Sequence, residues 1–186
     1  MNTTQNHGAI TPAHQLRAQR FANPVFALGM ATSYLMNKPA FAALPFGHWS
    51  RVLIGQINRG HYLFVLSGKS VVGFAGWALA STRDAEAWLA GRSDPAAQDG
   101  RAGECIILNV WDASTAEAHK MLVDEMRRVV KDKVAIYAKR EYGGGRSRPL
   151  KLRVNEFIRK HIEAADGGAK AASTALRQHH AEFAAK

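Results

Sequence analysis

The sequence predicts an α+β fold with mixed α/β layers, in which a mixed β-sheet is flanked by helices. The chain has 186 residues, the length of one domain or of one domain with tails. Hydrophobic residues make up 47% of it, enough to bury a core, which excludes global disorder. Segments with the helical spacing of apolar residues alternate with short apolar segments typical of strands. This alternation indicates helices layered on a sheet.

The first part of the chain is expected to be mainly helical. Residues 1–12 are polar and are interpreted as a loose arm. Residues 13–20 are expected to form a short helix. Residues 26–36 are expected to form a longer helix that stops before Pro39, because the residue before a proline avoids the helical region.

A second helix and a hairpin are expected next. The helix opens within residues 44–48, continues with apolar side chains at i, i+3 and i+4, and ends at Gly60. Residues 61–66 and 71–78 form the two strands of the hairpin. Gly68 supplies the positive φ that its tight turn requires.

Two capping-box patterns place the helices of the second half. Ser81 to Asp84 and Ser114 to Glu117 each have the residue types that begin a helix. The remaining expected elements are a loop over 91–102, strands over 104–111, 134–138 and 149–154, and a C-terminal helix over 171–184. This order is compatible with a GNAT-like sheet, although periodicity alone does not select it. We interpret residues 1–20 as a flexible N-terminal arm and residues 21–186 as one domain.

The chain is strongly basic, and most of its excess charge lies near its C-terminus. The net charge is +10, and 11 Lys and Arg against five acidic residues fall within residues 139–186. Such charge suggests an acidic partner: nucleic acid, an anionic membrane surface or an acidic protein. Arg140, Arg146 and Arg148 flank three glycines in a predicted loop. This loop is interpreted either as a solvated hairpin loop or as a phosphate-binding segment.

Several classes of protein are excluded by the composition. No uncharged apolar run is long enough to span a bilayer, and the first residues lack the pattern of a secretory signal. The single Cys105 excludes a disulfide framework and a cysteine-rich zinc site, and suggests the reducing cytoplasm. The eight histidines show no metal-ligand spacing, so no metal site is expected.

Three residues stand out as candidates for chemistry. His48 at a helix start is a candidate general base, or else a surface or capping residue. Asn109 and Asp112 lie near the end of an apolar strand, where catalytic groups tend to sit in α/β sheets. Asp112 is alternatively a cap for the following helix, together with Ser114.

Three stretches together resemble the RTX toxin-activating lysine acyltransferases, the haemolysin- and cyclolysin-activating family. The first runs from Ala27-Leu28-Gly29 to Tyr34-Leu35-Met36 and Pro39, and the second from Pro45 through Gly60-His61-Tyr62-Leu63 to Trp77-Ala78. The third is Leu176 to Phe183. The resemblance spans about residues 26–183.

The resemblance implies a GNAT-like, dimeric, cytoplasmic acyltransferase with no tightly bound cofactor. Its donor is a fatty acyl thioester on acyl carrier protein, and its acceptor is a lysine amine of a protein or peptide, such as an RTX-like protein. Acyl carrier protein is acidic, so the basic surface has a natural partner and Arg140, Arg146 and Arg148 become candidates for binding the carrier or its prosthetic group.

The sequence departs from this family at its catalytic pair. The family's histidine falls on Phe41, and its aspartate falls on Asn109, or on Leu108 with a shifted gap. Neither a phenylalanine nor an asparagine titrates. Three hypotheses follow: an acyltransferase that uses other groups, with His48 and Asp112 nearest; a catalytically silent relative that binds the carrier or a secreted client; and a nucleic-acid-binding protein.

Overall fold

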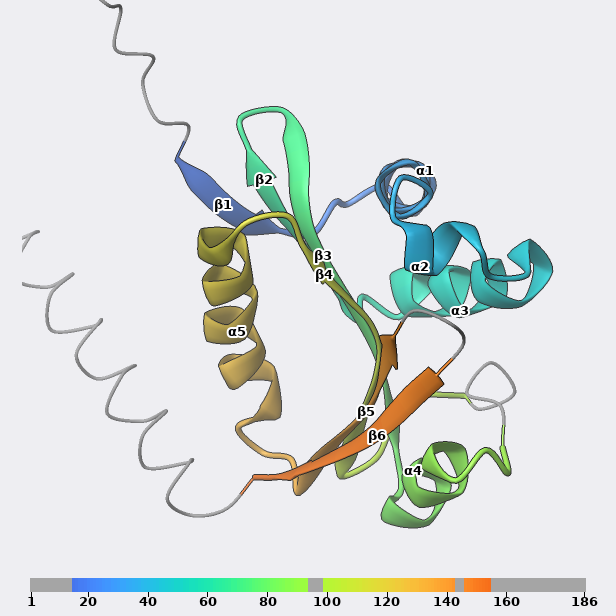
Figure 1. Cartoon of the computed structure of the whole chain (residues 1–186). Helices are drawn as coiled ribbons and strands as arrows, with labels where there is room; N and C mark the ends of the chain where they lie inside the picture. The colour runs from blue at the N-terminus through green and yellow to red at the C-terminus, as the bar shows by residue number, and fades with distance from the viewer. Residues whose placement is uncertain (1–14, 94–98, 143–145, 155–186) are drawn as a thin grey trace, which may run out of the picture.

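A computed structural model describes residues 15–93, 99–142 and 146–154. In this part of the chain six strands form one sheet in sequence order, β1 to β6, and helices cover both of its faces (Figure 1). The elements are β1 Leu16–Gln19, α1 Pro24–Leu35, α2 Pro39–Ala42, α3 Phe46–Asn58, β2 Tyr62–Ser67, β3 Ser70–Ala80, α4 Thr82–Leu89, β4 Cys105–Ala113, α5 Ala116–Val130, β5 Ala135–Tyr142 and β6 Arg146–Arg153. Neighbouring strands are antiparallel except β4 and β5, which are parallel and joined through α5. The predicted mixed sheet flanked by helices is confirmed.

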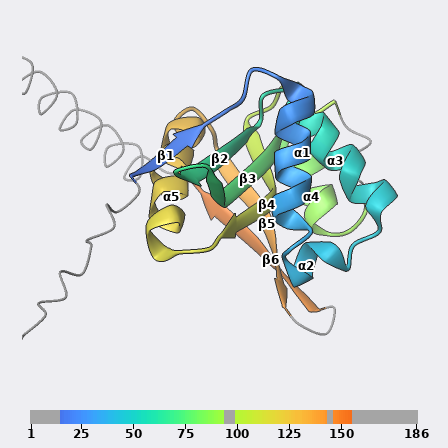
Figure 2. The ribbon, with the colours of Figure 1, turned by 90° about the horizontal axis from the view of Figure 1, so that it is seen from above.

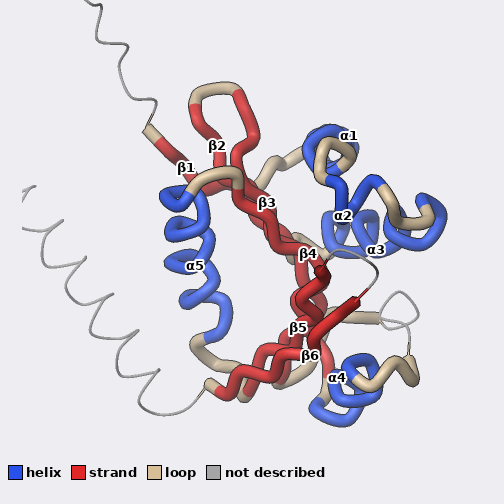
Figure 3. The backbone as a smooth tube through the Cα atoms, in the orientation of Figure 1, coloured by secondary structure: helices blue, strands red, loops and turns tan. Residues whose placement is uncertain are grey.

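The helices form two layers, one on each face of the sheet. Helix α5 covers one face, and α1, α2, α3 and α4 lie on the other (Figures 1 and 3). The buried side chains divide accordingly: Leu122 of α5 packs against Val65 and Ile106, whereas Leu35 of α1 and Leu53 of α3 belong to the opposite cluster. Helices α1 and α3 lie side by side (Figure 2).

The ends of three helices follow their local sequence. The side chain of Asn23 accepts hydrogen bonds from the first turn of α1 at 2.9 and 3.1 Å, and Pro24 occupies the first position of that helix. Ser81 caps α4 and Thr115 caps α5, each by accepting a backbone N–H at 3.1 Å. The capping box at Ser81 is therefore confirmed, whereas the box predicted from Ser114 is one residue out, because Thr115 and not Ser114 caps α5.

Two predicted segments are wrong. The helix expected over residues 13–20 is replaced by strand β1, which pairs with β2 from Leu16 to Gln19. Leu16 and Ala18 alternate toward the α5 face, so burial against a strand edge overrides a weak helical tendency. Residues 16–19 therefore do not belong to a flexible arm, while residues 1–14 lie outside the described residues.

The basic segment predicted as a loop is mostly strand. Strands β5 and β6 pair as far as Tyr142 opposite Arg146, so residues 139–142 and 146–149 continue the ladder. Pro149 fits because β6 is an edge strand, where a missing N–H is tolerated. The short helix α2 was not predicted, and the C-terminal helix predicted over 171–184 lies outside the described residues.

A β-bulge interrupts the pairing of β3 with β4 at the centre of the sheet. Gly76 lies opposite Val110 but Trp77 lies opposite Leu108, so Asn109 is an extra residue in β4. On each side of the bulge, successive side chains of β4 point to opposite faces of the sheet. The extra residue shifts this alternation by one position. Leu108 packs toward α5, as Trp111 does two places beyond the bulge, and Val110 packs toward α1 and α3.

The same point marks where β4 leaves β5. Their last paired residues are Leu108 and Ala138. Beyond them, β4 from Val110 onward pairs with β3, and β5 from Lys139 onward pairs with β6. The two parallel strands therefore part like a fork, and their inner backbone edges have no ladder partner among the described residues.

The backbone of β3 at the bulge is covered by a buried side chain of α3. Gln56 is fully buried, and a Cβ atom built on Gly76 would lie only 2.3 Å from its Oε1 atom. Glycine at position 76 is therefore required by the space that Gln56 occupies.

We expect Gly76→Ala to lower the free energy of unfolding by about 1–3 kcal/mol, because the added methyl group would displace the amide of the fully buried Gln56 side chain. Urea denaturation measures this change. Gly29→Ala is the matched control: nothing lies within 4 Å of its added Cβ, and the helical position should gain about 0.5–1 kcal/mol. The double variant Gly76→Ala with Gln56→Ala should lose less stability than the sum of the losses of the two single variants, because the alanine at position 56 removes the clash. Additive losses of stability would contradict the steric explanation.

Candidate functional site

The residues beyond the bulge bring a carboxylate, a phenol, an ammonium group and a hydroxyl together. Asp112 lies on β4, Tyr34 in the last turn of α1, Lys38 between α1 and α2, and Ser114 just before α5. The Tyr34 hydroxyl donates to Asp112 Oδ2 at 2.5 Å and lies 3.1 Å from Ser114 Oγ. Lys38 Nζ is 2.9 Å from Asp112 Oδ2 and 3.0 Å from Ser114 Oγ. We call these four residues the Asp112 cluster.

The bulge determines which face carries this cluster. Because it changes the alternation of β4, Asp112 shares the face of Val110, which packs against α1 and α3. Without the extra residue, Asp112 would face α5 and would not meet Tyr34. The side chains of Lys38 and Asp112 each retain 23% of their exposure, so the ion pair is shielded but open to a substrate.

The cluster holds its phenol and its ammonium group in their protonated forms. Burial raises the pKa of Tyr34, and its hydrogen bond to the Asp112 carboxylate raises it further. Burial acts to lower the pKa of Lys38, but hydrogen bonds and charge interactions with Asp112 and Tyr34 outweigh this effect and raise that pKa. The Lys38 ammonium also lies 4.7 Å from the centre of the Tyr34 ring.

Asp112 is the predicted site residue around which other functional groups gather. It does not cap α5, because Thr115 does so, and that alternative interpretation is wrong. Asn109 is the extra residue of the bulge, and its buried Oδ1 atom has no hydrogen-bond partner among the residues that the structure describes. His48 lies in the first turn of α3 with an exposed side chain, and Phe41 on α2 packs against the core between α1 and α3.

The three predicted arginines lie elsewhere. Arg140 is opposite Arg148, and Arg146 is two residues from Arg148, so all three share one face of the β5–β6 pair. Ile136 lies on the same face of β5 as Arg140 and packs against the α5 cluster, so the arginines lie on the α5 side of the sheet. Asp112 points to the opposite side, toward α1. The arginines therefore form a basic surface on a ribbon that extends from the sheet (Figure 2), and the structure does not join them to the Asp112 cluster.

Sequence reasoning missed Tyr34, Lys38 and Ser114. One signal was present: between residues 21 and 50, Lys38 is the only Lys, Arg, Asp or Glu. A single charge in such an apolar stretch calls for a partner, and Tyr34 four residues earlier points to the same side of the chain. The partner itself was not predictable, because Asp112 lies 78 residues beyond Tyr34 and its orientation depends on the bulge.

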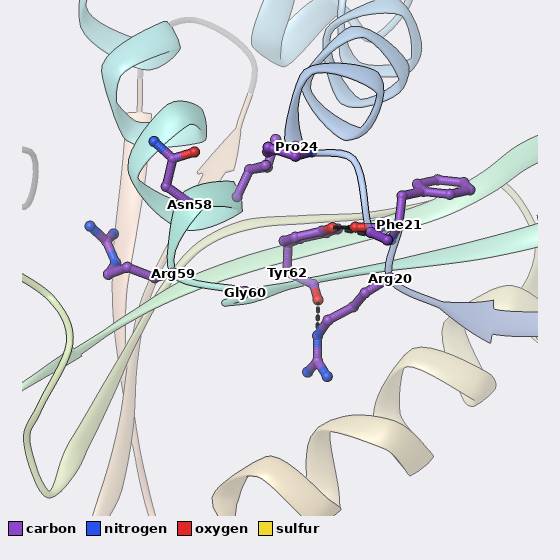
Figure 4. Close-up of a pocket in the computed structure, with 9 residues that line it drawn as sticks. Arg20, Phe21, Pro24, Asn58, Arg59, Gly60 and Tyr62 are labelled. Atoms are coloured by element: carbon purple, nitrogen blue, oxygen red, sulfur yellow. Dashed lines mark hydrogen bonds between the residues drawn. The ribbon is translucent and has the colours of Figure 1, made fainter.

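A separate open pocket of about 380 Å³ lies between the β1–α1 and α3–β2 connections (Figure 4). Its polar walls already bond to one another: Arg20 donates to the Tyr62 carbonyl at 2.7 Å, and the Tyr62 hydroxyl bonds the Phe21 carbonyl at 2.8 Å. None of the predicted site residues lines it. These bonds secure the chain between β1 and α1.

Two further findings concern the described ranges 15–93, 99–142 and 146–154. No group of three or more His, Cys, Asp or Glu side chains there is arranged to hold a metal ion. None of the helices in these ranges has the length and apolar character needed to cross a membrane.

A phenol, a carboxylate and an ammonium group in mutual contact form a site equipped for proton transfer and for polarising a carbonyl group. The model of the RTX toxin acyltransferase family matches residues 21–156, most of the chain. The chain therefore belongs to the RTX toxin acyltransferase family, as its sequence predicted, and is an acyltransferase by family.

Similar solved structures include two GNAT proteins. One is assigned to the GNAT acetyltransferase family and comes from Desulfovibrio desulfuricans, with 11% identity over 68% of this chain and 72% of that chain, and a TM-score of 0.38. The other is the loading GNATL domain of CurA from Lyngbya majuscula, with 9% identity over 79% of this chain and 81% of that chain, and a TM-score of 0.42. No curated protein matches the sequence significantly.

We expect Asp112→Asn to lower the pKa of Tyr34, because it removes the negative charge that opposes phenolate formation while keeping an oxygen acceptor. In the wild-type protein Tyr34 should titrate above the ordinary value of 10.0. The folded state thus favours the protonated phenol, and the stability that this contributes is present below pH 10 and lost as the pH rises further. Nuclear magnetic resonance of ring-labelled tyrosine measures both titrations.

Asp124→Asn is the matched control for this titration. Asp124 pairs with Lys120 and Arg127 on α5, and its replacement should leave the Tyr34 titration unchanged. An equal shift in both variants, or none in Asp112→Asn, would contradict the assigned contact.

Proposed function

We propose that this protein transfers a fatty acyl group from the thioester of acyl carrier protein to a lysine side-chain amine of a protein or peptide. The observation that carries the proposal is the Asp112 cluster, whose titratable groups lie at the open end of the fork between β4 and β5. By the sequence resemblance, the family's catalytic positions fall on Phe41 and on Asn109 or Leu108, and none of these residues moves a proton. The cluster supplies such groups close to those positions.

The fork supports binding of an extended, amide-containing arm. Past Leu108 and Ala138 the facing edges of β4 and β5 present backbone N–H and C=O groups without a ladder partner among the described residues. Such edges recruit extended chains by main-chain hydrogen bonding. A phosphopantetheine arm is linear and carries amides, and the buried Oδ1 atom of Asn109 offers one more acceptor beside the fork.

The proton chemistry of the reaction suits the cluster. A lysine amine must lose its proton before it attacks a thioester, because its ordinary pKa is about 10.4. The Asp112 carboxylate is the base of the cluster, and the Tyr34 hydroxyl is a neutral donor for the departing thiolate. Lys38 is held as an ammonium group that favours negative charge on the reacting carbonyl oxygen.

The basic β5–β6 ribbon supports an acidic carrier as the donor. Arg146 and Arg148 are exposed on one face of this ribbon. Complementary charge of this kind accelerates association and fixes orientation more than it increases affinity. Nucleic acid would be attracted by the same charge, and it is distinguished experimentally below.

The direct test is to incubate the protein with acyl carrier protein that carries octanoyl, lauroyl or palmitoyl chains, together with lysine-containing peptides. Mass spectrometry detects acyl-lysine. We expect Asp112→Asn to lower kcat by about 10²–10⁴-fold, because it removes the base. Asp124→Asn on α5 should retain wild-type turnover, and so should His48→Ala, because His48 is not part of the cluster.

Other outcomes select the competing hypotheses. Carrier binding without any transfer would identify a silent relative. Binding to DNA with a steep salt dependence, without carrier binding, would identify a nucleic-acid-binding protein. Unchanged turnover in Asp112→Asn would remove the cluster from the chemistry.

The ribbon generates a separate prediction. Arg146→Glu with Arg148→Glu should raise KM for the acylated carrier protein by about tenfold or more and leave kcat nearly unchanged, because the charges guide association. Steady-state kinetics over a range of salt concentrations measures this. Arg83→Glu with Arg92→Glu on and after α4 matches the change in net charge and should have a smaller effect. Equal effects of the two pairs would contradict a carrier surface on the ribbon.

A further inference from the structure

The geometry points to Ser114 as a nucleophile that carries the acyl group as an oxygen ester between donor and acceptor. The inference rests on the proposed function and deepens it, because it assigns the route of transfer. Its basis is the surroundings of the Ser114 hydroxyl, which lies 3.0 Å from Lys38 Nζ and 3.1 Å from the Tyr34 hydroxyl.

The Ser114 side chain does not cap α5. It stands beside a helix start, where serine commonly caps, but Thr115 holds that position and accepts the N–H of Ala118 at 3.1 Å. The Ser114 backbone is fixed instead by its N–H, which donates to the Val72 carbonyl at 2.8 Å. Its hydroxyl is thus left to the Asp112 cluster, and its exposure makes it accessible to an acyl group.

The cluster has the arrangement by which proteins activate a serine. A nucleophile requires a basic or proton-relaying group within hydrogen-bond distance and a third group that orients this partner. Tyr34 is the proton-relaying partner of Ser114, Lys38 is a cationic donor to it, and Asp112 orients both, at 2.5 Å from the Tyr34 hydroxyl and 2.9 Å from Lys38 Nζ. All four groups lie on the face that the bulge of β4 turns toward α1.

The protonation states decide the role of each partner. Lys38 is tied to Asp112 as an ammonium group, so it donates to Ser114 Oγ and stabilises the developing alkoxide. The Tyr34 hydroxyl stands between Ser114 and Asp112, and it can take the serine proton as it passes its own proton to the carboxylate. The nearby amino end of α5 also favours negative charge on the tetrahedral intermediate.

The reaction then balances in two steps. In the first, Ser114 Oγ bonds to the thioester carbon, the carbon–sulfur bond breaks, and the serine proton moves through Tyr34 to Asp112 and on to the departing thiolate. In the second, the neutral amine bonds to the ester carbon, the carbon–oxygen bond breaks, and the amine proton returns to Ser114 Oγ. The sum is one thioester and one amine converted to one amide and one thiol.

The experiment mixes the full-length protein with octanoyl, lauroyl or palmitoyl carrier protein, without an acceptor, and quenches the reaction in acid. We expect an acyl adduct approaching one per chain, which peptide mapping places on Ser114, and ping-pong kinetics once acceptor peptide is added. Ser114→Ala should abolish the adduct and lower kcat for transfer by at least about 10²-fold. Ser33→Ala, at an exposed position of α1, is the matched control and should retain both.

Ser114→Cys keeps the inference testable if Ser114→Ala fails to fold. Its adduct should be a thioester that neutral hydroxylamine removes, whereas the wild-type oxygen ester should require alkaline hydroxylamine. Transfer at the wild-type rate by Ser114→Ala, or an adduct on another residue, would overturn the inference while the proposed function stands. Absence of both adduct and transfer in the wild-type protein would overturn the proposed function and this inference together.

Discussion

The extra residue in β4 is the constraint on which the rest of this structure depends. With Gly76 opposite Val110 and Trp77 opposite Leu108, Asn109 changes the alternation of the central strand. Leu108 before it therefore packs toward α5, and Val110 after it packs toward α1 and α3. A single insertion thus allows one strand to pack against α5 along most of its length and still present Asp112 to α1. Bulges are common beside active sites because they re-aim a side chain in this way.

The bulge, the fork and the buried Gln56 meet at one level of the sheet. Gln56 fills the space above Gly76, so α3 approaches the backbone of β3 where the bulge distorts it. The pairing of β4 with β5 ends at Leu108, the residue before the bulge. Within the described part of the chain, buried polar atoms of Gln56 and Asn109 have no hydrogen-bond partner at this level. Buried polar groups are normally bonded, so this is where water or a ligand has most to gain by entering.

Much of the fold was predictable because its signals are local. Capping residues at Ser81 and Thr115, apolar spacing in α3 and the glycine turn of the β2–β3 hairpin each depend on a few neighbouring residues. Strand β1 was not predictable, because four residues gain their structure by pairing with a distant edge. Of the candidate site, only Asp112 was predicted from the sequence. Its other members come from α1, the α1–α2 connection and the residue before α5, and their meeting depends on a register shift that residue types alone do not reveal.

The sequence resemblance implies that Phe41 stands at the position of the family's histidine, and this geometry suits a phenylalanine there. Phe41 packs against the core between α1 and α3, where a charged imidazole would be poorly solvated. Three residues earlier, Lys38 leaves that core and reaches Asp112, which compensates its charge. The connection between α1 and α2 thus supplies an aromatic side chain to the interior and an ammonium group to the site. If proton transfer passes through the cluster, Asp112 and Tyr34 take the part that the resemblance implies for a histidine at position 41. A histidine introduced at position 41 would then lie against the core, as Phe41 does, and would not replace Asp112.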